Sequence, residues 1–312
     1  LAVAFRQTPA VGIRADSRRL RKTQGEVRER MNECVTKYRV LAVDVDGTLF
    51  NSNDEVTPAV REAIHRAHDV GMRIIVATGR RYRRALEAVE PFEGLPISLI
   101  TASGALVKNP VSHETLLEMR LSDAEVRTII RVIRDHGYHP IVNCDTFEAG
   151  IDFYHPGPNG PNEQMQEFLL KNAPYGEVRE DFYASPPAGV HAGLTMGTFD
   201  EMGVVDRALK EALPESLATH VIRSPHYVGF ICEFASCGAT KWSAIQHLVR
   251  EWGIGEAEVC CVGDDINDIS MLTGAGLGVA MGNAVDSVKT CADLVAPTHD
   301  EDGLAWVISR IL

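Results

Sequence analysis

The sequence has no apolar run long enough to cross a lipid bilayer. Its longest hydrophobic stretches stop well short of the roughly 18 residues that a membrane-spanning helix needs. A surplus of positive charge is also missing, because 31 Lys and Arg residues face 43 Asp and Glu residues and the formal net charge is -12. An acidic surface repels phosphate backbones. We therefore expect neither a membrane protein nor a nucleic-acid-binding protein.

The spacings of a disulfide framework and of a zinc site are missing too. The seven cysteines are scattered without a C-x-x-C pair, and the 11 histidines form no H-E-x-x-H motif. Cys260 and Cys261 lie inside an apolar run, where successive strand residues point to opposite faces, so we expect both thiols in the core. This usage is typical of a reduced, cytoplasmic protein.

The 312 residues exceed the usual size of one domain, so we expect two. Residues 1–36 are rich in arginine and have no sustained helical or strand periodicity, so we interpret them as a disordered N-terminal extension. Two origins stay open. One is a transit peptide, and the other is an over-extended gene start with Met31 as the true initiator.

From Tyr38 onward, short apolar strands alternate with amphipathic helices. The runs RVLAV, RIIVA and ISLIT read as buried strands, and Thr57 followed by Pro58 marks the start of a helix that stops at Gly71. The alternation of strands and helices breaks off near Met119, where strand-like runs mix with helices and a Pro/Gly loop. It resumes with a helix capped by Thr240.

This pattern predicts an α/β fold in which a Rossmann-like parallel-sheet core is interrupted by an inserted α+β cap domain. The strand pairs of the insert predict antiparallel pairing there. The expected domains are the first core part, the cap and the second core part, at residues 37–118, 119–226 and 227–312.

Polar side chains follow several apolar runs, where ligands bind in parallel sheets. Asp44 and Asp46 follow the first strand, Thr78 and Gly79 the second, and GDDIND (263–268) a later one, while Lys241 begins a helix. Hard oxygen ligands suit Mg²⁺. A carboxylate that attacks a phosphate meets repulsion of about 4 kcal/mol per charge pair, which a metal and a lysine can cancel. These residues therefore indicate magnesium-assisted phosphoryl transfer.

The motifs DVDGT, ATGR, a lysine and GDDIND, in this order, resemble the haloacid dehalogenase superfamily. The insertion between the second and third motifs, together with the run GLGVAMGNA, looks more narrowly like the Cof-type phosphatases with a C2B cap. The resemblance extends from Arg39 to the C-terminus and is weak in the cap.

The resemblance implies a role for each motif residue. Asp44 would be the nucleophile that forms an aspartyl-phosphate, and Asp46 the general acid and base. The phosphate-binding residues would be Thr78, Gly79, Lys241 and Asn267, and the Mg²⁺ ligands Asp44, Asp46, Asp264 and Asp268. Ser103 stands where Cof-type chains often have asparagine, which leaves the substrate contact of that position open.

Simpler interpretations compete for some of these residues. Thr78 also suits the N-cap of a helix that starts at Arg80. The arginine run from Arg80 to Arg84 is more typical of a solvated helix face than of a phosphate or nucleic-acid patch, and Arg80 is its best candidate for a role at the rim of the site. In the cap, His155, Asn159 and Arg223 are either substrate contacts or plain surface residues, and loop polarity alone favours the second view.

We therefore expect a Mg²⁺-dependent phosphatase whose partner is a small phosphorylated metabolite, such as a sugar phosphate, nucleotide or cofactor phosphate. Two alternatives stay open: a phosphotransferase resembling phosphomannomutase, and a non-catalytic sensor of a phosphorylated metabolite. The sequence does not indicate an oligomeric state.

Overall fold

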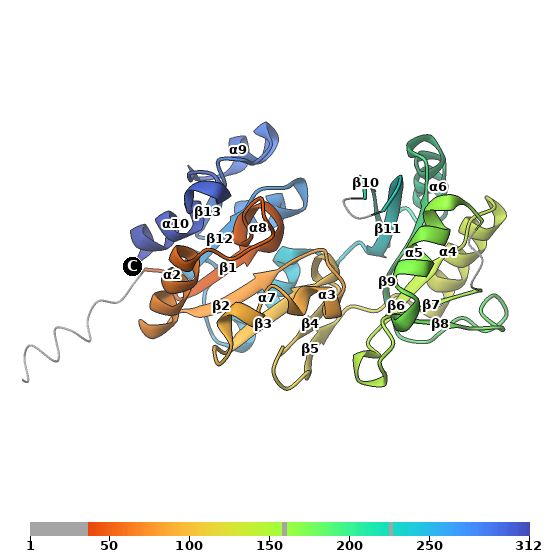
Figure 1. Ribbon diagram of the computed structural model, residues 1–312, viewed down its shortest axis with the longest axis horizontal. Helices are drawn as coiled ribbons and strands as arrows, with labels where there is room; N and C mark the ends of the chain where they lie inside the picture. Colours follow the sequence, from red (N-terminus) through yellow and green to blue (C-terminus); the bar gives the residue numbers. More distant parts are fainter. Residues whose placement is uncertain (1–36, 158–160, 225–226) are drawn as a thin grey trace, which may run out of the picture. The chain divides into compact units, whose positions relative to one another are not determined.

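The first of two β-sheets contains the strands that carry the sequence motifs (Figure 1). The computed structural model describes residues 37–157, 161–224 and 227–312, so the expected extension at 1–36 lies outside the described residues. Neighbouring strands of this sheet are parallel from β14 to β3, whereas β4 and β5 are antiparallel additions at one edge. In spatial order the strands are β14 (Leu294–Val295), β13 (Leu277–Ala280), β12 (Val259–Gly263), β1 (Val40–Asp44), β2 (Arg73–Ala77), β3 (Ile97–Thr101), β4 (Leu106–Lys108) and β5 (Thr115–Glu118).

Helices cover both faces of this sheet, which explains why its central strands are apolar throughout. Apolar residues of α2 and α10 pack on one face, and those of α7 and α8 pack on the other. Cys260 belongs to the first of these clusters and Cys261 to the second, as their alternation predicts. The helices that accompany the sheet are α2 (Pro58–Asp69), α3 (Tyr82–Leu86), α7 (Lys241–Glu251), α8 (Ile269–Gly274), α9 (Asp286–Cys291) and α10 (Gly303–Ile311).

The second sheet is formed by the middle of the chain. Its strand pairs are antiparallel except for the parallel pair β7 and β8. Helices α4 (Asp123–Asp135) and α6 (Phe199–Ala212) pack on one face, and α5 (Glu163–Lys171) covers part of the other (Figure 1). The strands in order are β10 (Leu217–Arg223), β11 (Phe230–Ser236), β9 (Val190–Gly197), β6 (Ile141–Cys144), β7 (Phe153–His155) and β8 (Gly176–Val178). The predicted fold class, a parallel-sheet core with an inserted α+β cap, is confirmed.

Local capping signals locate the helix starts that were read from the sequence. The Thr57 side chain accepts a hydrogen bond from the Val60 amide at the start of α2, and Ser122 forms its capping box with Glu125 at the start of α4. Thr240 caps α7. Such signals are reliable because they depend only on residues within one helical turn.

Two expectations differ from the structure. Helix α3 starts at Tyr82 rather than at Arg80, and the Thr78 hydroxyl accepts a hydrogen bond from the Arg80 amide in the turn before it. Strand β11 lies in the range 227–312 expected for the second core part, yet it pairs with β9 and β10 of the second sheet. An alternating strand pattern does not specify which sheet the strand joins, so this pairing could not be predicted from local periodicity.

Candidate active site

The end of β1 places two carboxylates in different surroundings. Asp44 is the last residue of the strand and is buried, whereas the Asp46 side chain is 58% exposed. Directly after Asp46, the backbone at Gly47 has a φ of 76°, a conformation that favours glycine. A Cβ atom on Gly47 would lie 2.3 Å from Asp264 Oδ2, so a larger residue would push this loop away from the Asp264 side chain, which follows β12 directly.

Lys241 is the first residue of α7 and is 1% exposed. Its ammonium donates to Asp44 Oδ1 at 2.5 Å and to Asp268 Oδ1 at 2.6 Å, and it lies 3.3 Å from Asn267 Oδ1. A buried ammonium is costly unless it is paired, and these carboxylates provide the pairing. The lysine therefore joins the first and last motifs, which are separated by more than two hundred residues in the sequence.

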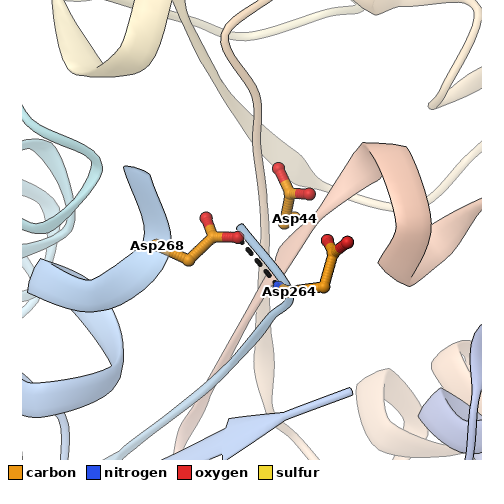
Figure 2. Close-up of side chains that lie close together, drawn as sticks. All are labelled: Asp44, Asp264 and Asp268. Carbon is orange, nitrogen blue, oxygen red and sulfur yellow. Dashed lines mark hydrogen bonds between the residues drawn. The ribbon is translucent and has the colours of Figure 1, made fainter. Parts of the chain in front are cut away.

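Three carboxylates converge beside this lysine (Figure 2). One oxygen each of Asp44, Asp264 and Asp268 lies within 4.8 Å of the others. Asp268 Oδ2 also accepts the backbone amides of Asp264 and Asp265, at 3.0 and 3.1 Å, which fixes the turn after β12. Oxygen atoms at this spacing form a set that could hold a hard divalent cation.

The charges of this cluster do not cancel, because three carboxylates face the single ammonium of Lys241. Burial raises the pKa of Asp44 well above its ordinary value, and the charge of Asp268 adds to this effect while Lys241 opposes it. Burial and then Asp268 raise the pKa of Asp264 to about 6. Burial alone would lower the pKa of Lys241, but Asp268 and Asp44 outweigh it and raise that pKa. The excess negative charge fits a divalent cation.

The remaining predicted phosphate-binding groups lie around the ends of β2 and β3. Thr78 is buried, and a Cβ atom built on Gly79 would lie 3.3 Å from Ser103 Oγ and 4.0 Å from Asn267 Nδ2. Ser103 has a φ of 55°, which is uncommon for serine. Gly79, Ser103 and Asn267 are thus brought together, and Ser103 remains next to the predicted phosphate-binding loop although it replaces an asparagine.

Two further residues contact the predicted site residues. Sequence reasoning offered Arg80 only as a candidate for the rim of the site, and it did not single out Asn283. Arg80 holds Asp46 through Nε at 3.1 Å and Nη2 at 2.5 Å. Asn283 donates to Gly47 O at 2.8 Å and to Asp264 Oδ2 at 3.2 Å. The sequence signals for them are weak, since Arg80 belongs to an arginine run that follows Gly79 and Asn283 lies in the run after β13.

Two of the three cap candidates lie within the described residues. His155 is buried, and its Nδ1 lies 2.6 Å from the Gly157 carbonyl oxygen. Arg223 is exposed at the end of β10. Asn159 lies outside the described residues. The hydrogen bond of His155 gives it a structural explanation that needs no substrate.

Comparison with known proteins decides the family. The family model for haloacid dehalogenase-like hydrolases matches residues 41–308. The chain belongs to this family. The resemblance to Cof-type phosphatases read from the motifs is confirmed, and the chain is an enzyme of the phosphatase type. In the part of the chain that the structure describes, no helix has both the length and the apolar character needed to cross a membrane.

Relatives of this haloacid dehalogenase-like hydrolase carry phosphatase names. Phosphatase YwpJ of Bacillus subtilis is 28% identical over 300 residues, covering 88% of this chain and 100% of the relative. The 5-amino-6-(5-phospho-D-ribitylamino)uracil phosphatase YcsE of the same organism is 28% identical and covers 86% of this chain and 94% of the relative.

Solved structures that resemble this chain support the same family. A haloacid dehalogenase-like hydrolase from Bacteroides thetaiotaomicron has a TM-score of 0.71 and 28% identity, covering 88% of this chain and 100% of the other. A subclass IIB sugar phosphatase of the same superfamily has a TM-score of 0.67 and 26% identity, with the same coverage.

Proposed function

We propose that this enzyme is a Mg²⁺-dependent phosphomonoesterase that hydrolyses small phosphorylated metabolites through a phosphorylated Asp44. The observation that carries the proposal is the position of Asp44 beside both Lys241 and the other two carboxylates. A buried carboxylate next to a fixed ammonium can attack phosphorus, because the ammonium offsets the repulsion between the two anions.

In the first step, an oxygen of Asp44 bonds to phosphorus while the bond from phosphorus to the leaving oxygen breaks. Asp46 donates its proton to that oxygen, so the leaving group departs as a neutral alcohol. In the second step Asp46 takes a proton from water as the water oxygen attacks phosphorus. The bond to Asp44 then breaks and inorganic phosphate leaves. Asp46 suits this exchange because its side chain reaches solvent.

Thr78, Gly79, Lys241 and Asn267 would hold the phosphoryl oxygens during both steps. The proposed metal ligands are Asp44, the backbone carbonyl of Asp46, Asp264 and Asp268, the last through water. Bound there, Mg²⁺ supplies positive charge to the phosphoryl group. The net charge of the acidic cluster with Lys241 supports a divalent ion.

Several similarities support a small substrate. The relatives named above include phosphatases of a ribityl compound and of sugars. We infer that the segment 119–236, which contains all six strands of the second sheet, is a cap that shapes the pocket for the leaving group. A cap that closes over the site would exclude water and large substrates such as phosphoproteins.

A phosphate-release screen tests the proposal. The purified enzyme is incubated with sugar phosphates, nucleotides and cofactor phosphates in the presence of Mg²⁺, with EDTA and Asp44→Asn as blanks. We expect several phosphomonoesters to be hydrolysed only with metal and only by the enzyme with Asp44. Inactivity across the whole panel would contradict the proposal and favour a sensor, whereas isomerisation of a sugar monophosphate upon addition of the bisphosphate would indicate a phosphotransferase.

A further inference from the structure

Asp264 is the one carboxylate of the acidic cluster that Lys241 does not hold. Asp44 and Asp268 each accept a hydrogen bond from the ammonium, at 2.5 and 2.6 Å. Within the part of the chain that the structure describes, Asp264 takes part in no ion pair, although one of its oxygens lies within 4.8 Å of oxygens of the other two. Carboxylates this close repel each other, so the position of Asp264 depends on other contacts.

Two neutral donors hold the Asp264 carboxylate, one on each oxygen. The hydroxyl of Thr48 donates to Oδ1 at 3.1 Å, and the side-chain amide of Asn283 donates to Oδ2 at 3.2 Å. Thr48 is buried in the segment between β1 and α2, and Asn283 lies in the segment after β13. A carboxylate oxygen can accept more than one contact. The two donors therefore fix Asp264 and leave both of its oxygens able to bind a cation.

The side-chain amide of Asn283 has a single orientation that suits its surroundings. Its Oδ1 accepts a hydrogen bond from the backbone amide of His299 at 3.0 Å. Its Nδ2 donates to Gly47 O at 2.8 Å as well as to Asp264. Turning the amide over would place its oxygen against a carbonyl and a carboxylate oxygen. Asn283 thus holds Asp264 at a fixed position relative to Gly47 and the neighbouring Asp46.

The partner of Asn283 Oδ1 is itself held in place. Asp300, directly after His299, accepts hydrogen bonds from the backbone amide and the hydroxyl of Ser52, at 2.9 and 2.7 Å. Ser52 lies between β1 and α2, in the same segment as Gly47. Both ends of the Asn283 amide are therefore connected to this segment. Ligand groups that are fixed before binding lower the entropy cost of binding.

We propose that Asn283, together with Thr48, is a positioning residue of the metal site: the two side chains hold Asp264 against the repulsion of the other carboxylates, where it can bind Mg²⁺. The inference rests on the Mg²⁺-dependent function proposed above. Removing a group that holds a metal ligand typically weakens metal binding 10- to 100-fold. Neither side chain is a phosphate-binding group in the proposed mechanism, so we expect the loss in metal affinity rather than in the chemical step.

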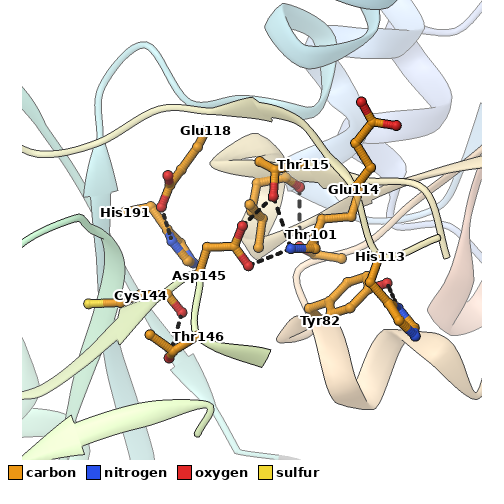
Figure 3. Close-up of polar contacts among 12 residues, drawn as sticks. Tyr82, Thr101, His113, Glu114, Thr115, Glu118, Cys144, Asp145, Thr146 and His191 are labelled. Carbon is orange, nitrogen blue, oxygen red and sulfur yellow. Dashed lines mark hydrogen bonds and ion pairs between the residues drawn. The ribbon is translucent and has the colours of Figure 1, made fainter. Parts of the chain in front are cut away.

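Calorimetric titration with Mg²⁺ in the absence of substrate tests the inference, and the quantity measured is the Kd for the metal. We expect Asn283→Ala and Thr48→Val each to raise this Kd about tenfold. Thr115→Val is the matched control. The hydroxyl of Thr115 also donates to an aspartate, but this is Asp145, which lies outside the acidic cluster (Figure 3). The control should bind Mg²⁺ as the unchanged enzyme does.

A second measurement separates positioning of a metal ligand from general support of the fold. The rate of 4-nitrophenyl phosphate hydrolysis is followed as the Mg²⁺ concentration rises. For Asn283→Ala we expect the concentration that gives half the maximal rate to rise about tenfold, while kcat at saturating Mg²⁺ stays within about threefold of the unchanged enzyme. A loss of kcat that saturating metal does not restore, with an unchanged half-maximal concentration, would contradict the inference.

The outcomes also separate this inference from the proposed function. If the unchanged enzyme neither binds Mg²⁺ nor needs it to hydrolyse 4-nitrophenyl phosphate, the proposed function itself is wrong. If it does both, and the Kd of Asn283→Ala and of Thr48→Val lies within about twofold of its own, only the positioning inference is wrong. An equal rise in Kd for Thr115→Val would also overturn it. Should Asn283→Ala not fold, Asn283→Ser and Thr48→Val supply the same comparison.

Discussion

At the scale of single residues, Asp44 combines burial with a charged partner. The strand end keeps it from water, and Lys241 fixes one of its oxygens. We predict that Asp44→Asn lowers kcat to below about one hundredth, because an amide cannot act as the nucleophile. Lys241 retains Asp268, and the side-chain volume hardly changes, so the variant should fold normally. Phosphate release and circular dichroism check this, and a tenth of the activity remaining in a folded variant would refute covalent catalysis by Asp44.

In the proposed mechanism Arg80 is a positioning residue, because it would act through Asp46. Its two-point contact needs a guanidinium group, which lysine cannot imitate. We predict that Arg80→Lys lowers kcat about tenfold for alkyl phosphates, whose leaving group needs a proton, but much less for 4-nitrophenyl phosphate. Steady-state kinetics with both esters measures the difference, and Arg84→Lys is the control. Equal losses for both esters would assign Arg80 to phosphate binding instead.

At the scale of elements, a buried ion pair joins β4 to the end of β6. Lys108 is 3% exposed and lies 2.5 Å from Asp145. We predict that Lys108→Met lowers the free energy of unfolding by about 3 kcal/mol, because it leaves a largely buried carboxylate without its cation. Urea unfolding measures this value, and the double variant Lys108→Met/Asp145→Leu should recover part of the loss.

The chain offers a matched control for this pair. Lys210 donates to Asp206 at 2.9 Å, and Asp206 also accepts from a threonine, but the lysine side chain is 54% exposed. Water screens such a pair, so Lys210→Met should cost less than about 0.5 kcal/mol. If Lys108→Met and Lys210→Met lowered the free energy of unfolding equally, the burial of Lys108 would have no energetic consequence.

Strand β11 carries a carboxyl group in an apolar part of the second sheet. Burial raises the pKa of Glu233 to about 7. Its cross-strand neighbours are His220 on β10 and Leu194 on β9. The folded protein retains this proton at pH values where the unfolded chain has lost it, so the contribution of Glu233 to the free energy of unfolding falls as pH rises from about 4.5 to 7 and is level above.

We predict that Glu233→Gln removes this fall. The variant should match the unchanged protein at pH 4.5 and exceed its free energy of unfolding by about 2 kcal/mol at pH 8. Urea unfolding across this pH range measures the free energy of unfolding of both proteins. Glu211→Gln, on the exposed side of α6, is the control. Parallel curves for the unchanged protein and the Glu233 variant would mean that the carboxyl group ionises normally.

At the scale of the whole molecule, the acidic cluster should couple metal binding to stability. A ligand that binds only the folded state at 100 times its Kd adds about 2.7 kcal/mol, or about 4 °C in Tm for a chain of this size. We predict that Mg²⁺ raises the Tm of the unchanged protein by such an amount and raises the Tm of Asp264→Asn much less. Asp265→Asn is the control, since this neighbouring carboxylate is exposed and outside the cluster. Equal rises in all three proteins would contradict a metal site there.

The sequence by itself determined the features that depend on short stretches of chain. Caps such as Thr57 and Ser122 act within one turn, and apolar runs specify strands. Because parallel strands end at one edge, the motif residues Asp44, Thr78 and Asp264 could be predicted to converge without any knowledge of the strand order.

Only the tertiary structure decided which distant side chains meet. The pairing of Arg80 with Asp46 and the hydrogen bonds of Asn283 depend on how separate loops pack, and no local pattern encodes such contacts. The same holds for β11, whose alternation suits either sheet. Local periodicity specifies an element and its buried face, whereas its partner is selected by the competition between all faces that the folded chain presents.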